Sequence, residues 1–96
     1  MPVGFVLEFA NIGQDKYEAI MKELGLKVGS NAGWPEGILT HVAGPTPNGM
    51  CVVDVWESEA AFGKFMDSRL GPAFAKVGGM PQPKVTTFQV VNSFQK

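Results

Sequence analysis

The sequence contains a single cysteine, Cys51, and a single histidine, His41, among its 96 residues. One cysteine cannot form a disulfide within the chain, and one cysteine with one histidine cannot supply the ligands of a Cys/His zinc site. Arginine is also represented once, by Arg69, and the eight basic residues are scattered singly against nine acidic ones, giving a formal net charge of −1. Proteins that bind the nucleic-acid backbone typically carry a basic patch, so we expect no nucleic-acid partner.

Long hydrophobic runs are absent as well. No stretch approaches the about 18 apolar residues that a transmembrane helix requires, and the first residues lack the basic start and apolar run of a signal peptide. We therefore expect a cytoplasmic protein with no membrane partner. The hydrophobic fraction of 45% and the charged fraction of 18% are ordinary for a globular chain. The length suits a single domain, which we expect to span residues 1–96.

Hydrophobic periodicity divides the first part of the chain into a strand, a helix and a loop. Residues 3–9 form a short apolar run rich in β-formers, which indicates a buried strand. Residues 14–24 carry apolar side chains at helical spacing with charged residues between them, which predicts an amphipathic helix. The core face of this helix is predicted to consist of Tyr17, Ile20, Met21 and Leu24. Residues 27–36 are rich in turn-forming residues, contain Trp34 and predict a loop.

The second part of the chain repeats the pattern. Residues 37–43 and 50–56 are β-like runs separated by GPTPNG, a segment dense in turn residues, which predicts a β-hairpin. Ser58 can cap a following helix, and Gly71-Pro72 is expected to interrupt that helix before a further short turn that ends at Gly78. The core face of the helix is predicted to consist of Phe62, Phe65, Met66 and Leu70. Residues 84–91 are β-branched and aromatic and predict a fourth strand.

The order β-α-β-β-α-β predicts an α+β protein with a ferredoxin-like fold, in which two helices cover one face of a four-stranded antiparallel sheet. Both faces of the hairpin strands are apolar in sequence. We expect one face to carry Ile38, Val42, Val53 and Val55, and the other to carry Leu39, Met50 and Val52. Because a bare apolar face must be covered, we expect a homodimer in which two sheets pack face to face.

His41 and Asp54 are the candidate catalytic residues. If Ala43 pairs with Met50 across the turn, His41 lies opposite Val52 and diagonal to Asp54 on the same face. A buried aspartate is costly without a partner, and a neighbouring imidazole is a suitable one. The pair could form a general base with the group that orients it. The alternatives are a structural hydrogen-bonded pair and an aspartate that lies in water near the strand end.

Trp34, Trp56 and Arg69 are the candidate substrate-binding residues. Trp34 could form a lid over a cavity mouth or cover the edge of a dimer. Trp56 lies where a strand runs into the second helix, and it could stack on a ligand or wedge the helix against the sheet. Arg69 could bind an anion, although a cation near the end of a helix is also favoured by the helix dipole. Cys51 lies beside valines and is interpreted as a small buried hydrophobic residue.

The junction between the third predicted strand and the second helix reads WESEAAF over residues 56–62 and is similar to the W-x-S-x-E-A-F pattern of one family. Together with the element order, it makes the chain resemble the dimeric α+β barrel superfamily, in particular small proteins of the antibiotic biosynthesis monooxygenase type. The resemblance implies a dimeric α+β barrel of two chains. It covers nearly the whole chain.

The resemblance also implies a chemistry. Oxygenase members are thought to need neither metal nor flavin, so no cofactor is expected; they bind an electron-rich phenol or anthrone whose carbanion reacts with oxygen. That chemistry requires an apolar pocket, a base and polar groups that hold an enolate. We therefore expect a monooxygenase-like enzyme, or a cyclase or isomerase, acting on an aromatic or polyketide-like molecule. His41 would be the base, Asp54 would orient it, and Trp34 or Trp56 would form an apolar wall. The alternative is a non-catalytic dimer that binds a hydrophobic small molecule, or an accessory protein.

Overall fold

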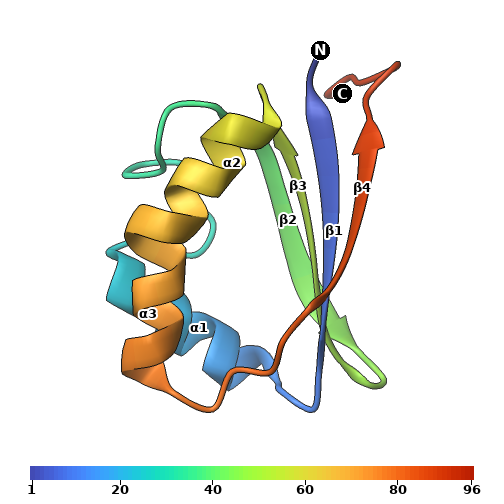
Figure 1. The fold of residues 1–96 in the computed structure, drawn as a ribbon. Helices are drawn as coiled ribbons and strands as arrows, with labels where there is room; N and C mark the ends of the chain where they lie inside the picture. Colours follow the sequence, from blue (N-terminus) through green and yellow to red (C-terminus); the bar gives the residue numbers. More distant parts are fainter.

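The computed structural model describes residues 1–96 and contains four strands and three α-helices, with a π-helical turn between the last two helices (Figure 1). In chain order the elements are β1 (Val3–Ala10), α1 (Gln14–Leu24), β2 (Ile38–Thr46), β3 (Gly49–Trp56), α2 (Glu59–Phe65), η1 (Met66–Leu70), α3 (Gly71–Val77) and β4 (Lys84–Gln89). The predicted β-α-β-β-α-β order is confirmed, with the second helix built from α2, η1 and α3.

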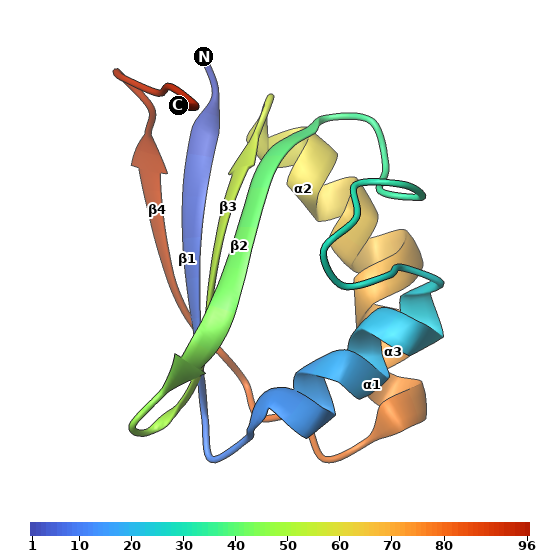
Figure 2. The same ribbon diagram turned by 180° about the vertical axis from the view of Figure 1, so that it is seen from behind.

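The four strands form one antiparallel sheet in the order β2-β3-β1-β4, which is the ferredoxin-like arrangement predicted from the sequence. Figures 1 and 2 show that all helices lie on one face of this sheet and that the other face is bare. The order places β2 at one edge, beside α1 and the loop that follows it (Figure 2). None of the helices has the length and hydrophobicity needed to span a membrane.

The core lies between the sheet and the helices because the strands alternate buried and less buried side chains. In the two central strands, every second side chain points at the helices and is buried. The buried side chains of β1 and β3 are Val3, Phe5, Leu7, Phe9, Met50, Val52, Asp54 and Trp56. Asp54 is the only charged residue among them, with 4% of its surface exposed. A carboxylate in this position requires hydrogen-bond partners.

The β2–β3 hairpin has a different register from the one predicted. Ala43 pairs with Val52 instead of Met50, because the strands continue to Thr46 and Gly49 and leave a turn of only two residues. The GPTPNG segment is therefore mostly strand. Pro45 is tolerated in it because β2 is an edge strand, where a missing backbone N–H need not break the sheet. The new register places His41 directly opposite Asp54, on the helix side of the sheet.

Ile38 lies on the face opposite to the one predicted, and Leu39 has no partner in β3. The pairing of β2 with β3 is irregular between Ile38 and Thr40, which takes one residue out of the simple alternation. Ile38 consequently packs against the core beside Trp56, whereas Leu39 is 51% exposed. Val42 and Val53 do share the bare face, as predicted, because they form a direct pair farther along the hairpin.

The second helix starts at the predicted cap and passes through the predicted interruption. The Ser58 hydroxyl accepts a hydrogen bond from the Ala61 backbone N–H at 3.1 Å. Ala60 stands where the W-x-S-x-E-A-F pattern has its glutamate. Instead of breaking at Gly71-Pro72, the helix widens into η1, in which the Gly71 N–H bonds to the Met66 carbonyl. The wider turn accommodates Pro72, which has no N–H to donate, and the helix ends at the predicted Gly78.

Candidate active site

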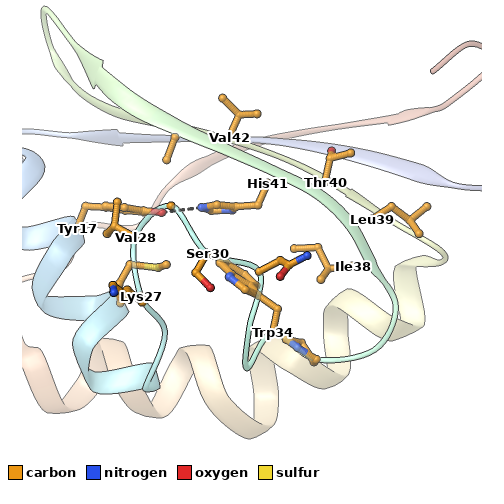
Figure 3. A pocket seen from close by; sticks show the side chains of 15 residues that line it. Tyr17, Lys27, Val28, Ser30, Trp34, Ile38, Leu39, Thr40, His41 and Val42 are labelled. Atoms are coloured by element: carbon orange, nitrogen blue, oxygen red, sulfur yellow. Dashed lines mark hydrogen bonds between the residues drawn. The ribbon is translucent and has the colours of Figure 1, made fainter. Parts of the chain in front are cut away.

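Three side chains from three elements form a continuous hydrogen-bonded chain below β2. His41 Nδ1 lies 2.7 Å from Asp54 Oδ1, and His41 Nε2 lies 2.6 Å from the Tyr17 hydroxyl oxygen. The second carboxylate oxygen of Asp54 accepts a hydrogen bond of 3.3 Å from the Trp56 indole N–H. Figure 3 shows the His41 ring meeting the Tyr17 hydroxyl, while Thr40 and Val42 project to the other side of the strand. The structure thus brings the two predicted catalytic residues together and adds Tyr17.

The direction of these hydrogen bonds follows from what each group can donate. An ionised carboxylate only accepts, so His41 carries a proton on Nδ1 and donates it to Asp54. In a neutral imidazole Nε2 is then the acceptor, and the Tyr17 hydroxyl donates to it. Asp54 therefore fixes both the tautomer and the orientation of His41. The unprotonated nitrogen points toward Tyr17 and can receive a proton through it.

The phenol of Tyr17 is held in its protonated form. Burial and, as the smaller cause, the negative charge of Asp54 together raise its pKa from the ordinary 10.0 to about 12. Both causes disfavour a phenolate at this position. At neutral pH Tyr17 therefore remains a hydrogen-bond donor to His41.

We expect a direct titration to show this shift, because Tyr17 is the only tyrosine in the chain. The ultraviolet absorbance of phenolate should develop around pH 12 instead of pH 10.0. Between these values the unfolded chain releases a proton that the folded protein retains, so the free energy of unfolding should fall as the pH rises from 10 towards 12. Asp54→Asn should lower the midpoint, since it removes one of the two causes. A wild-type midpoint at 10 would contradict the buried, hydrogen-bonded phenol.

A groove runs along the edge of the sheet next to this chain of side chains. It has a volume of about 690 Å³ and lies between β2 and the segment of residues 27–35. Tyr17, His41 and Trp34 line it together with the exposed Val28 and Leu39. The volume lies within the range of about 300–1,000 Å³ typical of small-molecule sites. The groove therefore gives a ligand access to the Tyr17 and His41 rings.

Trp34 covers His41 from the loop side. The centroids of the two rings are 4.5 Å apart, and Trp34 also lies 6.0 Å from the Phe65 ring. Its loop bends at Gly33 and Gly37, whose φ angles of 85° and 99° suit glycine. Trp34 is half-buried and lines the groove. Trp34 thus forms part of the groove wall next to the His41 ring.

The other two candidate substrate-binding residues lie away from the groove. Trp56 is fully buried, with 0% exposure, and supports Asp54 through its N–H. Arg69 donates hydrogen bonds to the backbone carbonyls of Leu24 at 2.9 Å and Gly33 at 3.3 Å. The guanidinium thus joins the end of α1 to the Trp34 loop, and Arg69 is not among the residues that line the groove. Cys51 is a free, partly buried cysteine on the bare face of the sheet.

Tyr17 is the site residue that sequence reasoning missed. It was assigned to the core face of α1 by its spacing, and it does line the core from there. Its hydroxyl, however, reaches His41, which is 24 residues away along the chain. The available signal was a tyrosine on the predicted core face of the first helix, because a phenol hydroxyl in a core needs a hydrogen-bond partner.

Neither a protein-family model nor a curated protein matches the sequence. Among solved structures, the chain is similar to SnoaB, a cofactor-independent oxygenase from Streptomyces nogalater, with 16% identity, a TM-score of 0.67, and coverage of 99% of this chain and 98% of SnoaB. It is similar to a proposed antibiotic biosynthesis monooxygenase from Chloroflexus aurantiacus, with 18% identity, a TM-score of 0.68 and the same coverage.

A third similar structure is a monooxygenase from the gene ActVA-Orf6 of Streptomyces coelicolor in complex with the ligand nanaomycin D. The identity is 18%, the TM-score is 0.56, and the match covers 99% of this chain and 91% of that one. At identities this low the likeness concerns the arrangement of helices and strands. Over nearly its whole length, the chain has the fold of the antibiotic biosynthesis monooxygenase-like proteins.

Proposed function

We propose that this protein is a monooxygenase-like enzyme that needs no cofactor and acts on an aromatic or polyketide-like small molecule. The observation that carries the proposal is the position of His41. One ring nitrogen is held by the buried carboxylate of Asp54, and the other reaches the Tyr17 hydroxyl at the wall of a groove that suits a small molecule. A base oriented by an acid, at the wall of a groove in which 8 of the 15 lining residues are hydrophobic, suits proton abstraction from a weakly acidic carbon.

In the proposed reaction an anthrone-like substrate lies in the groove with its acidic C–H or its tautomeric hydroxyl at Tyr17. As Tyr17 takes the substrate proton, it passes its own proton to His41 Nε2, so the phenol never has to exist as a free phenolate. The imidazolium that results is stabilised by Asp54 at 2.7 Å. The apolar ring of Trp34 covers one side of the His41 ring, with the two centroids 4.5 Å apart.

The oxidant is dioxygen. The substrate anion gives electrons to dioxygen and forms a carbon–oxygen bond, and the resulting hydroperoxide loses water. The methylene carbon of the anthrone loses two hydrogens and gains one oxygen atom as the carbonyl of a quinone. The second oxygen atom leaves as water, which carries the two hydrogens. No further reductant is required.

The similar structures support this class of reaction, since one of them is a cofactor-independent oxygenase and another holds nanaomycin D. The test is oxygen uptake with product mass on a panel of anthrones, hydroquinones and naphthols, with no metal or flavin added. We expect one dioxygen consumed per quinone formed from an anthrone, and one labelled atom in the product from labelled dioxygen. The His41→Ala protein serves as the control for uncatalysed oxidation. Equal rates with both proteins would refute the proposal.

A non-catalytic small-molecule-binding protein is the second candidate. It is favoured by one observation, namely that both ring nitrogens of His41 are already hydrogen-bonded within the protein. Such a protein would bind members of the same panel without consuming oxygen or changing their mass. An isomerase or cyclase would change the structure of a substrate without oxygen uptake, so product analysis separates all three.

We also propose that two copies of the chain pair through their bare sheet faces. The proposal is supported by the apolar side chains on this face, among them Val42 with 66% exposure and Phe88 with 44%. Val53, on the central strand of the same face, suits a test. Light scattering at micromolar concentration should give a dimer, and Val53→Lys should give a monomer, whereas Val28→Lys in the groove should not. A wild-type monomer would refute the pairing.

A further inference from the structure

A second, smaller space lies inside the core behind the candidate base. It is a cavity of about 50 Å³ between the sheet and the helices, lined by side chains from β1, β3, α1 and the second helix. Fourteen of its 16 lining residues are hydrophobic, and the other two are His41 and Asp54. The cavity is much smaller than the groove and cannot hold an aromatic substrate. Its size suits one or two very small molecules.

The wall of the cavity has few free hydrogen-bonding groups for a water molecule. A buried water needs two to four polar partners. Both ring nitrogens of His41 are engaged with Tyr17 and Asp54, and the carboxylate oxygens of Asp54 accept from His41 and Trp56. No buried side-chain nitrogen or oxygen lacks a hydrogen-bond partner. The space is therefore suited to a small apolar molecule, as dry cavities lined by aliphatic and aromatic groups are.

The position of the cavity relates it to the reaction. Tyr17, Met21, Trp34 and His41 line both the cavity and the groove, so the two spaces adjoin at these side chains. Of these four side chains, only Trp34 comes from a loop, and it follows the turn at Gly33, whose φ is 85°. A small molecule in the cavity would therefore lie directly behind the surface on which the substrate anion forms.

We propose that this cavity is the dioxygen site of the protein, from which dioxygen meets the substrate anion at the Trp34 and His41 wall. The inference rests on the proposed oxygenase function. Dioxygen is the one small apolar reactant of that reaction, and the cavity is both small and apolar. Dioxygen has no polar group to satisfy and prefers an apolar space to water. Storage behind the base keeps it next to the substrate while the groove remains free for the larger molecule.

Dioxygen itself is a suitable probe, since it is paramagnetic and speeds the nuclear relaxation of groups near it. Methyl-labelled protein would be compared under nitrogen and under pressurised oxygen, without any substrate. We expect the Leu7 and Ile20 methyl groups, which line the cavity, to relax much faster under oxygen than the equally buried Val3 methyl groups, which do not. Equal effects at Leu7, Ile20 and Val3 would overturn the proposal, whether or not the protein turns over any substrate.

Two matched variants sharpen the test. Val52→Ile adds one methylene group at the cavity wall, and Val3→Ile adds the same group at a buried core position outside the cavity. Val52→Ile should abolish the oxygen effect at Leu7 and raise the KM for dioxygen about tenfold, with the KM for the aromatic substrate unchanged. Val3→Ile should alter neither quantity. A rise in the KM for the aromatic substrate alone would place the substrate in the cavity and overturn the proposal.

The two hypotheses fail in different ways. If no member of the panel stimulates oxygen uptake, the oxygenase function is wrong, while the relaxation experiment still reports on the cavity. If oxygen uptake is observed but the relaxation effect at Leu7 equals that at Val3, the oxygenase function stands and the dioxygen site is wrong.

Discussion

Replacement of His41 by alanine is expected to lower the rate of substrate-dependent oxygen uptake by about 10²- to 10⁴-fold, the usual contribution of a positioned general base. His41 is the only side chain that joins the buried carboxylate of Asp54 to the Tyr17 hydroxyl at the groove. Without it, Tyr17 has no acceptor for its proton, and its raised pKa of about 12 keeps the phenol protonated at neutral pH, so that it cannot take the substrate proton on its own. The loss should appear in kcat, since the groove wall otherwise remains.

Two companion variants separate chemistry from folding. His41→Gln keeps a side chain that can hydrogen-bond in the same place but cannot accept the proton, and we expect it to be as inactive as His41→Ala while melting closer to the wild type. Asp54→Asn should retain more activity than either variant, because it weakens the orientation of the imidazole without removing it. Full activity of His41→Gln would assign the pair a structural role.

Replacement of Trp56 by alanine is expected to produce the largest loss of stability among single substitutions in this chain. Trp56 is the only large side chain that is completely buried. It packs between the sheet and the helices, and its ring centroid lies 5.7 Å from that of Phe62 and 5.4 Å from that of Phe65. Removal of such a side chain typically costs about 3–5 kcal/mol. A protein of this size is typically stable by only about 5–15 kcal/mol, so the variant should retain little margin.

Thermal unfolding measures this effect. A loss of 1 kcal/mol lowers the Tm of a domain of this size by roughly 4–8 °C, so Trp56→Ala should melt far below the wild type. Trp34→Ala provides the matched control, because Trp34 is half-buried and lies on a loop. We expect it to lose much less stability but to weaken substrate binding in the groove. Similar melting temperatures for the two variants would contradict the different roles assigned to the two tryptophans.

The hairpin shows why the proximity of His41 and Asp54 could be predicted from the sequence although the predicted strand register was wrong. Side chains alternate between the faces of a strand with a period of two. The true pairing of His41 with Asp54 differs from the predicted pairing of His41 with Val52 by two residues, so the side chains between the irregularity and the turn, His41 and Val42 among them, stay on their predicted faces. A shift of one residue would have separated the pair. The same periodicity cannot reveal a bulge, so Ile38 lies on the face opposite to its predicted one.

Contacts between distant elements were the harder part to predict. Helical spacing placed Tyr17 correctly on the inner side of α1, but the reach of its hydroxyl to His41 depends on how α1 crosses the sheet. Arg69 was read from its place near the end of a helix, whereas its partners are the carbonyls of Leu24 and Gly33, 45 and 36 residues away. Periodicity describes one element at a time, and such contacts are set by the packing of several elements.

The wide helical turn at η1 affects how this chain should be aligned with others of its fold. A π-type turn contains one residue more than the α-helical turn it replaces. A relative that lacks the turn would need a one-residue gap before Gly71. Without that gap, every residue after the turn would be compared with a residue one position away from its structural equivalent. Phe74 packs against Phe9 with ring centroids 5.9 Å apart and would be matched with a residue that faces solvent. Sequence identity over the last third of the chain therefore depends on placing that single gap from the backbone geometry.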